Sequence, residues 1–336
     1  LVGIGGDWFD VIPLSGSRVA LVVGDVVGHG ITSSATMGRL CTAVRTLADV
    51  DLPPDELLTH LDDLVTHLAS DDRGDEVAEL GATCLYAVYD PVSRRLTLAA
   101  AGHPAPALLL PDGTASLVPM AAGPPLGVGG LPFEATELEL PEGAVVALYT
   151  DGLIEDRDRD VDHATAELCR SLAAPAETLD TLCDTVLKAV LPEEPSDDVA
   201  LLLARTRALG AGQVATWDIT PDPEHVAAAR QAAIEQLTAW RLDEAAFVTE
   251  LVVSELVTNA IRYGAPPIQL RLIRDRTLIC EVSDGSSTSP HLRRAHAFDE
   301  GGRGLLLVAQ LTKRWGSRQT PRGKTIWAEQ PLPPAM

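Results

Sequence analysis

One stretch near the start of the chain constrains the fold more than any other. The apolar residues 20–23 lead into Gly24 and Asp25, and small or glycine residues follow as far as Gly30. A short apolar run bounded by turn residues is typical of a buried strand, which places Asp25 at the mouth of a sheet. Because a carboxylate is costly to bury without a cationic partner, we expect something cationic to meet Asp25.

Bulk properties narrow the class of protein. The chain has 336 residues, more than one typical core holds, which predicts two domains. Its formal net charge of −22 comes without a basic cluster, which argues against nucleic acid and against an anionic membrane surface as partners. The five cysteines are scattered, which predicts free thiols in a cytoplasmic protein rather than disulfides or a zinc site. No apolar run approaches the ~20 residues of a membrane span.

The region before residue 205 predicts strands mixed with helices. Strands 7–13 and 18–25 form a hairpin with a turn at 15–17, so Asp7 and Asp25 lie close together despite their distance in sequence. Thr32 or Ser33 caps a helix that runs to about Ala48. A second helix starts at Pro53-Pro54-Asp55. Further strands are predicted at 82–90, 95–101, 107–110, 134–140, 145–150 and 198–204, and further helices at 162–173 and 176–190.

The polar, glycine-containing segment 205–213 is the linker candidate. We place a first domain at 1–206, a linker at 207–213 and a second domain at 214–336. The second domain predicts strands at 214–219, 267–273, 278–283 and 324–329, a helix from Pro223 to Trp240, a longer helix capped by Asp243 that ends at Tyr263-Gly264, and a helix at 304–313.

Four aspartates of the first domain, Asp7, Asp25, Asp151 and Asp197, share one context, because each lies beside the end of an apolar strand. One such aspartate is usually a turn former, but four from four strands are harder to explain as turns. Clustered carboxylates repel one another unless cations neutralise them, and oxygen ligands select hard ions such as Mg²⁺ or Mn²⁺. Two such ions hold a bridging water and clamp a transferring phosphoryl group.

Five ordered motifs carry a family resemblance: Gly5-Gly6-Asp7-Trp8-Phe9-Asp10, Gly24-Asp25-Val26-Val27-Gly28-His29-Gly30, Ala101-Gly102-His103-Pro104, Tyr149-Thr150-Asp151-Gly152 and Ser196-Asp197-Asp198. Together they resemble the bacterial branch of the PP2C (PPM) serine/threonine phosphatases, which includes the sporulation and general-stress phosphatases. The resemblance implies an αββα sandwich with a site for two or more Mn²⁺ or Mg²⁺ ions at one end of the sheets. It covers residues 1 to about 205.

The resemblance also implies roles for single residues. Asp25 bridges both metals, and Val26 offers its carbonyl oxygen. Asp151 and Asp197 complete the shell of one metal, and Asp7 serves the other side. Asp10 and Asp198 are further neighbours.

The sequence departs from the eukaryotic members at two points. Their histidine two positions after the bridging aspartate is Val27 here, and His29 lies two residues further on, so we do not assign the role of general acid to it. Their phosphate-binding arginine has no counterpart in residues 1–6. His103 is a structural residue of a bend in the simplest interpretation.

The second domain carries a different constellation. Glu255 and Asn259 share one face of an apolar helix, Asp284-Gly285 ends a strand, and Gly301-Gly302-Arg303-Gly304 opens a helix. Alternatively, Glu255 and Asn259 form only a solvated polar stripe on an amphipathic helix. Glycines at a helix N-terminus offer backbone N–H groups to phosphate.

This order resembles the GHKL (Bergerat) ATP-binding fold, a two-layer α/β domain, and within it the anti-sigma-factor serine kinases. The resemblance implies that Asn259 holds Mg²⁺ of Mg-ATP, Glu255 acts as base on a substrate serine, Asp284 binds adenine, and Gly302 and Gly304 border the phosphates. The usual Asp-x-Gly-x-Gly spacing is absent after Asp284.

We therefore expect an α+β signalling protein in which a metal-dependent phosphatase is fused to a kinase-like domain. The implied substrate is a phosphorylated STAS-domain antagonist of an anti-sigma factor, in partner switching that frees a sigma factor. In the alternative, the second domain binds a sigma factor or its antagonist without catalysis, or senses ATP. Because the chain begins at Leu1 rather than Met, we also expect an upstream sensor domain outside this sequence.

Overall fold

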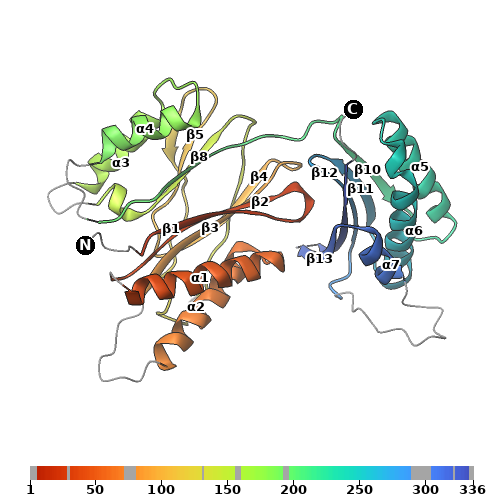
Figure 1. The fold of residues 1–336 in the computed structure, drawn as a ribbon, viewed down its shortest axis with the longest axis horizontal. Coiled ribbons are helices and arrows are strands. Elements are labelled where there is room, and N and C mark those ends of the chain that lie inside the picture. Colours follow the sequence, from red (N-terminus) through yellow and green to blue (C-terminus); the bar gives the residue numbers. More distant parts are fainter. Residues whose placement is uncertain are drawn as a thin grey trace. The chain divides into compact units, whose positions relative to one another are not determined.

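The computed structural model describes residues 6–28, 31–71, 81–130, 132–155, 160–191, 197–288, 304–320 and 322–332. The chain divides into two compact units, one made mainly of residues up to Ala208 and one that begins at Leu209 (Figure 1). Both units mix helices with sheets, which confirms the predicted fold class. Within the described ranges, no helix combines the length and the apolar character that crossing a membrane requires.

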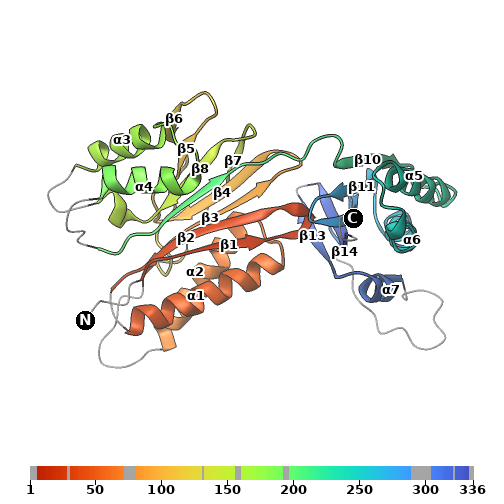
Figure 2. The same ribbon diagram turned by 45° about the horizontal axis from the view of Figure 1, so that its top comes forward.

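The first unit is a four-layer αββα sandwich, as predicted. One sheet has the order β1-β2-β3-β4-β7 and the other β6-β5-β8-β9. Helices α1 and α2 lie along the first sheet and α3 and α4 along the second (Figures 1 and 2). The bounds are β1 Trp8–Pro13, β2 Val19–Val26, α1 Ile31–Asp49, α2 Pro54–Asp71, β3 Ala82–Asp90, β4 Arg95–Ala101, β5 Ala107–Leu109, β6 Ala115–Leu117, β7 Thr136–Glu139, β8 Val145–Tyr149, α3 Val161–Leu172, α4 Leu179–Val190 and β9 Leu201–Arg205.

Alternation along β2 explains why Asp25 faces the middle of the sandwich. Successive side chains of a strand point to opposite faces of its sheet. Ala20 and Val22 pack with the apolar stripes of α1 and α2, whereas Leu21 and Val23 pack against the second sheet. Asp25 continues the row of Leu21 and Val23, so it lies where the apolar core between the sheets ends.

The second unit is a two-layer α/β domain. Its antiparallel sheet has the order β10-β11-β12-β14-β13, and residues of α5, α6 and α7 pack on one face of it (Figure 1). The bounds are β10 Val214–Ile219, α5 His225–Ala239, α6 Ala246–Tyr263, β11 Ile268–Arg274, β12 Thr277–Asp284, α7 Gly304–Leu311, β13 Arg314–Thr320 and β14 Gly323–Pro331.

Three local predictions were wrong. Helix α1 begins at Ile31, so Thr32 and Ser33 lie within it instead of preceding it. Asp243 opens a short 3₁₀ turn, Asp243–Ala245, and accepts a hydrogen bond from Thr238 Oγ1 at 2.9 Å instead of capping α6. Strand β13 was missed and α7 is shorter than predicted, because the polar segment after Leu311 pairs with β14.

Candidate functional site

Asp7 and Asp25 lie side by side at the end of the core between the two sheets. Asp7 precedes β1, and Asp25 is the second-last residue of β2. The Asp7 carboxyl donates a hydrogen bond to the Asp25 carboxylate. Burial, and then the negative charge of Asp25, raises the pKa of Asp7 to about 7. The hairpin prediction that these two residues meet is confirmed.

Asp151 and Asp197 complete one electrostatic cluster with this pair. Burial is the main cause that raises the pKa of Asp25, and the charges of Asp151 and Asp197 raise it further. The backbone N–H of Gly152 donates to Asp151 Oδ1 at 2.9 Å, and that of Asp198 donates to Asp197 Oδ1 at 2.8 Å. Each of these carboxylates is thus oriented by the residue that follows it.

Two glycines allow the backbone to approach the cluster closely. A Cβ atom on Gly6 would overlap the carbonyl oxygen of Val26 and lie 2.8 Å from Asp25 Oδ1. A Cβ atom on Gly152 would overlap the carbonyl oxygen of Asp198. The glycines of the pairs Gly6-Asp7 and Asp151-Gly152 therefore serve to avoid a steric clash with the neighbouring backbone. The Val26 carbonyl oxygen borders the cluster.

The residues of this cluster fit divalent cations by their chemistry. They offer oxygen ligands, Asp7 and Asp25 are partly buried, and the charges of the cluster repel one another, which is the situation that a hard cation relieves. Among the described residues, no group of three or more Asp, Glu, His or Cys side chains is already arranged to hold a metal ion. The cluster thus consists of a hydrogen-bonded pair, Asp7 and Asp25, with Asp151 and Asp197 acting on it through their charges.

Two further residues, which the motifs alone did not assign, contact the cluster or its neighbours: Thr150 contacts Asp7, and His103 contacts Thr83, the cross-strand partner of Asp25. Thr150 is fully buried, and its hydroxyl donates to Asp7 Oδ2 at 2.6 Å. His103 is 2 % exposed, and burial lowers its pKa to about 4, so the ring is neutral at pH 7. The alternation of side chains along β8 could have indicated Thr150, because Thr150 continues the row of Val146 and Leu148 that faces the other sheet.

Other residues of the same motifs lie apart from the cluster. The carboxylate of Asp10 accepts two hydrogen bonds from Arg45 of α1, at 2.6 and 2.9 Å, which gives it a structural partner. Val27 is 60 % exposed, and its N–H donates to the carbonyl oxygen of Gly81. His29 lies outside the described residues.

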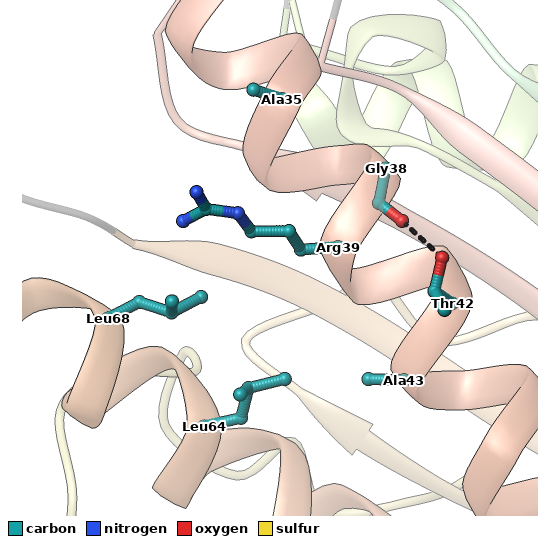
Figure 3. Close-up of a pocket in the computed structure, with 7 residues that line it drawn as sticks. All are labelled: Ala35, Gly38, Arg39, Thr42, Ala43, Leu64 and Leu68. Carbon is teal, nitrogen blue, oxygen red and sulfur yellow. Dashed lines mark hydrogen bonds between the residues drawn. The ribbon is translucent and has the colours of Figure 1, made fainter.

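A groove of about 460 Å³ opens between α1 and α2 (Figure 3). Small residues of α1 leave space for this groove, and Arg39 extends across it (Figure 3). Thr42 Oγ1 donates to the Gly38 carbonyl oxygen. The lining holds no carboxylate, imidazole or thiol, and no predicted site residue. The aspartate cluster is therefore the stronger candidate for chemistry. The lining residues are Ala35, Gly38, Arg39, Thr42, Ala43, Leu64 and Leu68.

In the second unit, the structure brings Glu255 of α6 against the start of α7. A Cβ atom on Gly304 would overlap Glu255 Oε2 and lie 3.0 Å from its Cδ, so glycine at this position lets the Glu255 carboxylate approach the start of α7 closely. Asn259 lies one turn further along α6 and is half-buried, like Glu255. Gly302 lies outside the described residues.

Asp284, the predicted adenine ligand, already has a cationic partner. Lys324 Nζ donates to Asp284 Oδ1 at 3.0 Å, and the side chains of Lys324 and Asp284 are 5 % and 1 % exposed. The N–H of Ser286 donates to the same oxygen at 2.8 Å. An amino group of a ligand that reached Asp284 would have to share the carboxylate with Lys324.

Solved structures are similar in fold to this chain, one over both units and one over 60 % of the chain. The crystal structure of the RsbU and RsbW domains of Rv1364c from Mycobacterium tuberculosis is 28 % identical, with a TM-score of 0.54, over 98 % of this chain and 88 % of that one. An S. agalactiae serine/threonine phosphatase is similar in fold alone, at 12 % identity and a TM-score of 0.50, over 60 % of this chain and 93 % of that one.

Comparison by sequence points the same way. The phosphoserine phosphatase RsbP of Bacillus subtilis (strain 168) is 30 % identical over 153 residues, which cover 45 % of this chain and 37 % of that protein. The matched part is thus well under two thirds of that relative. Residues 219–329 match the model of the histidine kinase-like ATPase domain.

The model of the Stage II sporulation protein E (SpoIIE) family matches residues 15–207, more than half of the chain, and these residues include Asp25, Asp151 and Asp197. The chain therefore belongs to the SpoIIE family.

Proposed function

We propose that the first unit is a metal-dependent phosphatase that hydrolyses phosphoserine or phosphothreonine in a protein substrate. The observation that carries the proposal is the cluster of four aspartates at one end of the sandwich, with the hydrogen-bonded pair Asp7 and Asp25 at its centre. The similarity to RsbP, a phosphoserine phosphatase, supports the reaction class.

The chain's own residues would divide the work as follows. Asp25 and the Val26 carbonyl would hold two Mn²⁺ or Mg²⁺ ions together, Asp151 and Asp197 would complete one shell, and Asp7 would complete the other. When bound, the ions supply a water of lowered pKa and stabilise the charge of phosphoryl transfer. Thr150 fixes the orientation of the Asp7 carboxylate through its 2.6 Å hydrogen bond.

The test is Mn²⁺-dependent release of phosphate from a phosphoserine peptide. The variants Asp25→Ala and Asp151→Ala should lose turnover by two or more orders of magnitude, whereas Asp10→Asn should retain it because Asp10 is paired with Arg45 outside the cluster. Wild-type rates in both alanine variants would refute the proposal.

The protein substrate that we propose is a phosphorylated STAS-domain antagonist of an anti-sigma factor, so that dephosphorylation would act in sigma-factor partner switching. The similarity to a structure that joins RsbU and RsbW domains in one chain supports this context. An upstream sensor domain would act on α1 and α2, between which the groove lies. Turnover of such a phosphorylated antagonist, compared with an unrelated phosphoprotein, tests the substrate assignment.

For the second unit we propose Mg-ATP binding, with Asn259 holding Mg²⁺, Gly302 and Gly304 bordering the phosphates, and Glu255 as base for a serine kinase reaction. The match to the histidine kinase-like ATPase model supports it, and so does the room that Gly304 leaves for Glu255. Calorimetry should detect Mg-ATP binding that Asn259→Ala weakens. No binding at millimolar ATP would refute this part.

One observation favours a second candidate for this unit. Because Lys324 already donates to Asp284 Oδ1, the amino group of adenine would have to share this carboxylate with Lys324. This competition favours a unit that binds a sigma factor or the antagonist without catalysis. Transfer of phosphate from ATP to the antagonist distinguishes the candidates, since only the kinase produces it. A pull-down of sigma factors that is independent of ATP would favour the binding module.

A further inference from the structure

Thr150 connects the two sheets of the first unit at the end that carries the aspartates. Its hydroxyl donates to Asp7 Oδ2 at 2.6 Å and accepts a hydrogen bond from the N–H of Ala200 at 2.8 Å. Asp7 leads into β1 of one sheet, and Ala200 leads into β9 of the other. One fully buried hydroxyl thus ties both sheets together next to the cluster.

His103 makes a second connection of the same kind. Its Nε2 lies 3.0 Å from the carbonyl oxygen of Tyr149, and its Nδ1 lies 2.8 Å from Thr83 Oγ1. Because a carbonyl oxygen only accepts, Nε2 carries the proton of the neutral ring, and Nδ1 accepts from the Thr83 hydroxyl. His103 therefore links β3 of one sheet to β8 of the other.

Both ends of the His103 bridge lie beside predicted metal ligands. Thr83 is the cross-strand partner of Asp25 in the β2–β3 ladder, and Tyr149 is two residues before Asp151. The bend that carries His103 is also fixed, because the Tyr149 hydroxyl donates to the carbonyl oxygen of Ala105 at 2.9 Å. The bridge thus joins β3, which pairs with the strand of Asp25, to β8, which ends two residues before Asp151.

We infer that Thr150 and His103 are positioning residues that fix the separation of the Asp7–Asp25 pair from Asp151 and Asp197. The inference rests on the proposed metal-dependent phosphatase site. Apolar packing between the sheets is non-directional, whereas hydrogen bonds of 2.6 to 3.0 Å fix both distance and orientation. Carboxylates on two separate sheets bind the same cations only if that separation is fixed.

The test measures Mn²⁺ affinity of the full chain by titration calorimetry. Outer partners of metal ligands are typically worth 10- to 100-fold in affinity, so Thr150→Val should raise the Kd for Mn²⁺ by about that factor. Thr206→Val is the matched control. The Thr206 hydroxyl is also buried, and it donates to the Pro141 carbonyl oxygen at 2.8 Å. Thr206 pairs through its N–H with the carbonyl oxygen of Ala144, the residue before β8, so it lies at the end of β8 that is opposite Thr150. This control should stay within about twofold of wild type, although it too loses a buried hydrogen bond.

Two more variants keep the test decisive if Thr150→Val folds poorly. Thr150→Ser retains the hydroxyl and should restore wild-type affinity, whereas His103→Phe keeps an aromatic ring without its hydrogen bonds and should weaken Mn²⁺ binding about tenfold or more. If Thr150→Val and His103→Phe bind Mn²⁺ as tightly as wild type, the inference is wrong and the proposed function stands. If wild type binds no Mn²⁺, the proposed function fails first.

Discussion

The buried ion pair between Lys324 and Asp284 gives the sharpest stability prediction. In Lys324→Met the ammonium is lost, but the carboxylate stays 1 % exposed, and among the described residues the N–H of Ser286 is its remaining donor. Removing one partner of a buried pair leaves an uncompensated charge, which typically costs about 3–5 kcal/mol. For a unit of this size, we expect the midpoint of thermal unfolding to fall by roughly 10–20 °C.

The matched control is an exposed pair in the same unit. Arg230 Nη1 lies 3.9 Å from Glu250 Oε1, and these side chains are 40 % and 42 % exposed. Exposed pairs contribute about 0–1 kcal/mol, so Arg230→Met should change stability little. The double variant Asp284→Asn with Lys324→Met should recover part of the loss, because it leaves no isolated buried charge.

Urea unfolding followed by tryptophan fluorescence reports on this unit, because four of the five tryptophans lie in it: Trp217, Trp240, Trp315 and Trp327. If Lys324→Met costs no more than Arg230→Met, the pair is not held away from water as described, and Asp284 is free to receive a ligand.

Three further predictions concern single residues. Because the pKa of His103 in the folded state is about 4, below its ordinary 6.5, the unfolded chain binds more protons between these values and stability falls as pH falls. Between pH 7 and pH 5, wild type should lose about 2 kcal/mol more than His103→Gln in urea unfolding followed by far-UV circular dichroism, which reports on both units, and equal losses would contradict the assignment. A Cβ atom on Gly24 would lie 2.7 Å from the Trp8 indole, so Gly24→Ala should destabilise the first unit by about 1–3 kcal/mol in the same assay. Gly304→Ala should fold normally, since it displaces only the flexible end of Glu255, yet weaken Mg-ATP binding in calorimetry.

Local sequence patterns predicted the parts of the fold that local physics decides. The alternation of apolar residues and the short turn at 15–17 were enough to pair β1 with β2 and to bring Asp7 beside Asp25. The order of strand-end aspartates and glycines indicated the cluster, because Gly6 and Gly152, which the close backbone approach requires, are direct sequence neighbours of Asp7 and Asp151. The roles of these aspartates in metal binding remain predictions.

What the sequence did not reveal depends on contacts between distant segments. Lys324 meets Asp284 because β12 pairs with β14 in that register, and no local pattern indicates the pairing. Strand β13 carries Arg314, Gly316 and Arg318 on one face, so it lacks the apolar alternation of a strand and is held by its ladder to β14. The motif around His103 was visible, but its bridge between the sheets follows only from the packing of the sandwich.

Direct titration of Mn²⁺ into the full chain tests the central claim, that carboxylates from two sheets form one cation site. We expect two bound ions per chain for wild type and for Asp10→Asn, because the Asp10 carboxylate is paired with Arg45. Asp25→Asn should lose at least one ion, because Asp25 is the proposed bridge. Unchanged stoichiometry and affinity in Asp25→Asn, or no Mn²⁺ binding by wild type at millimolar concentration, would contradict this claim.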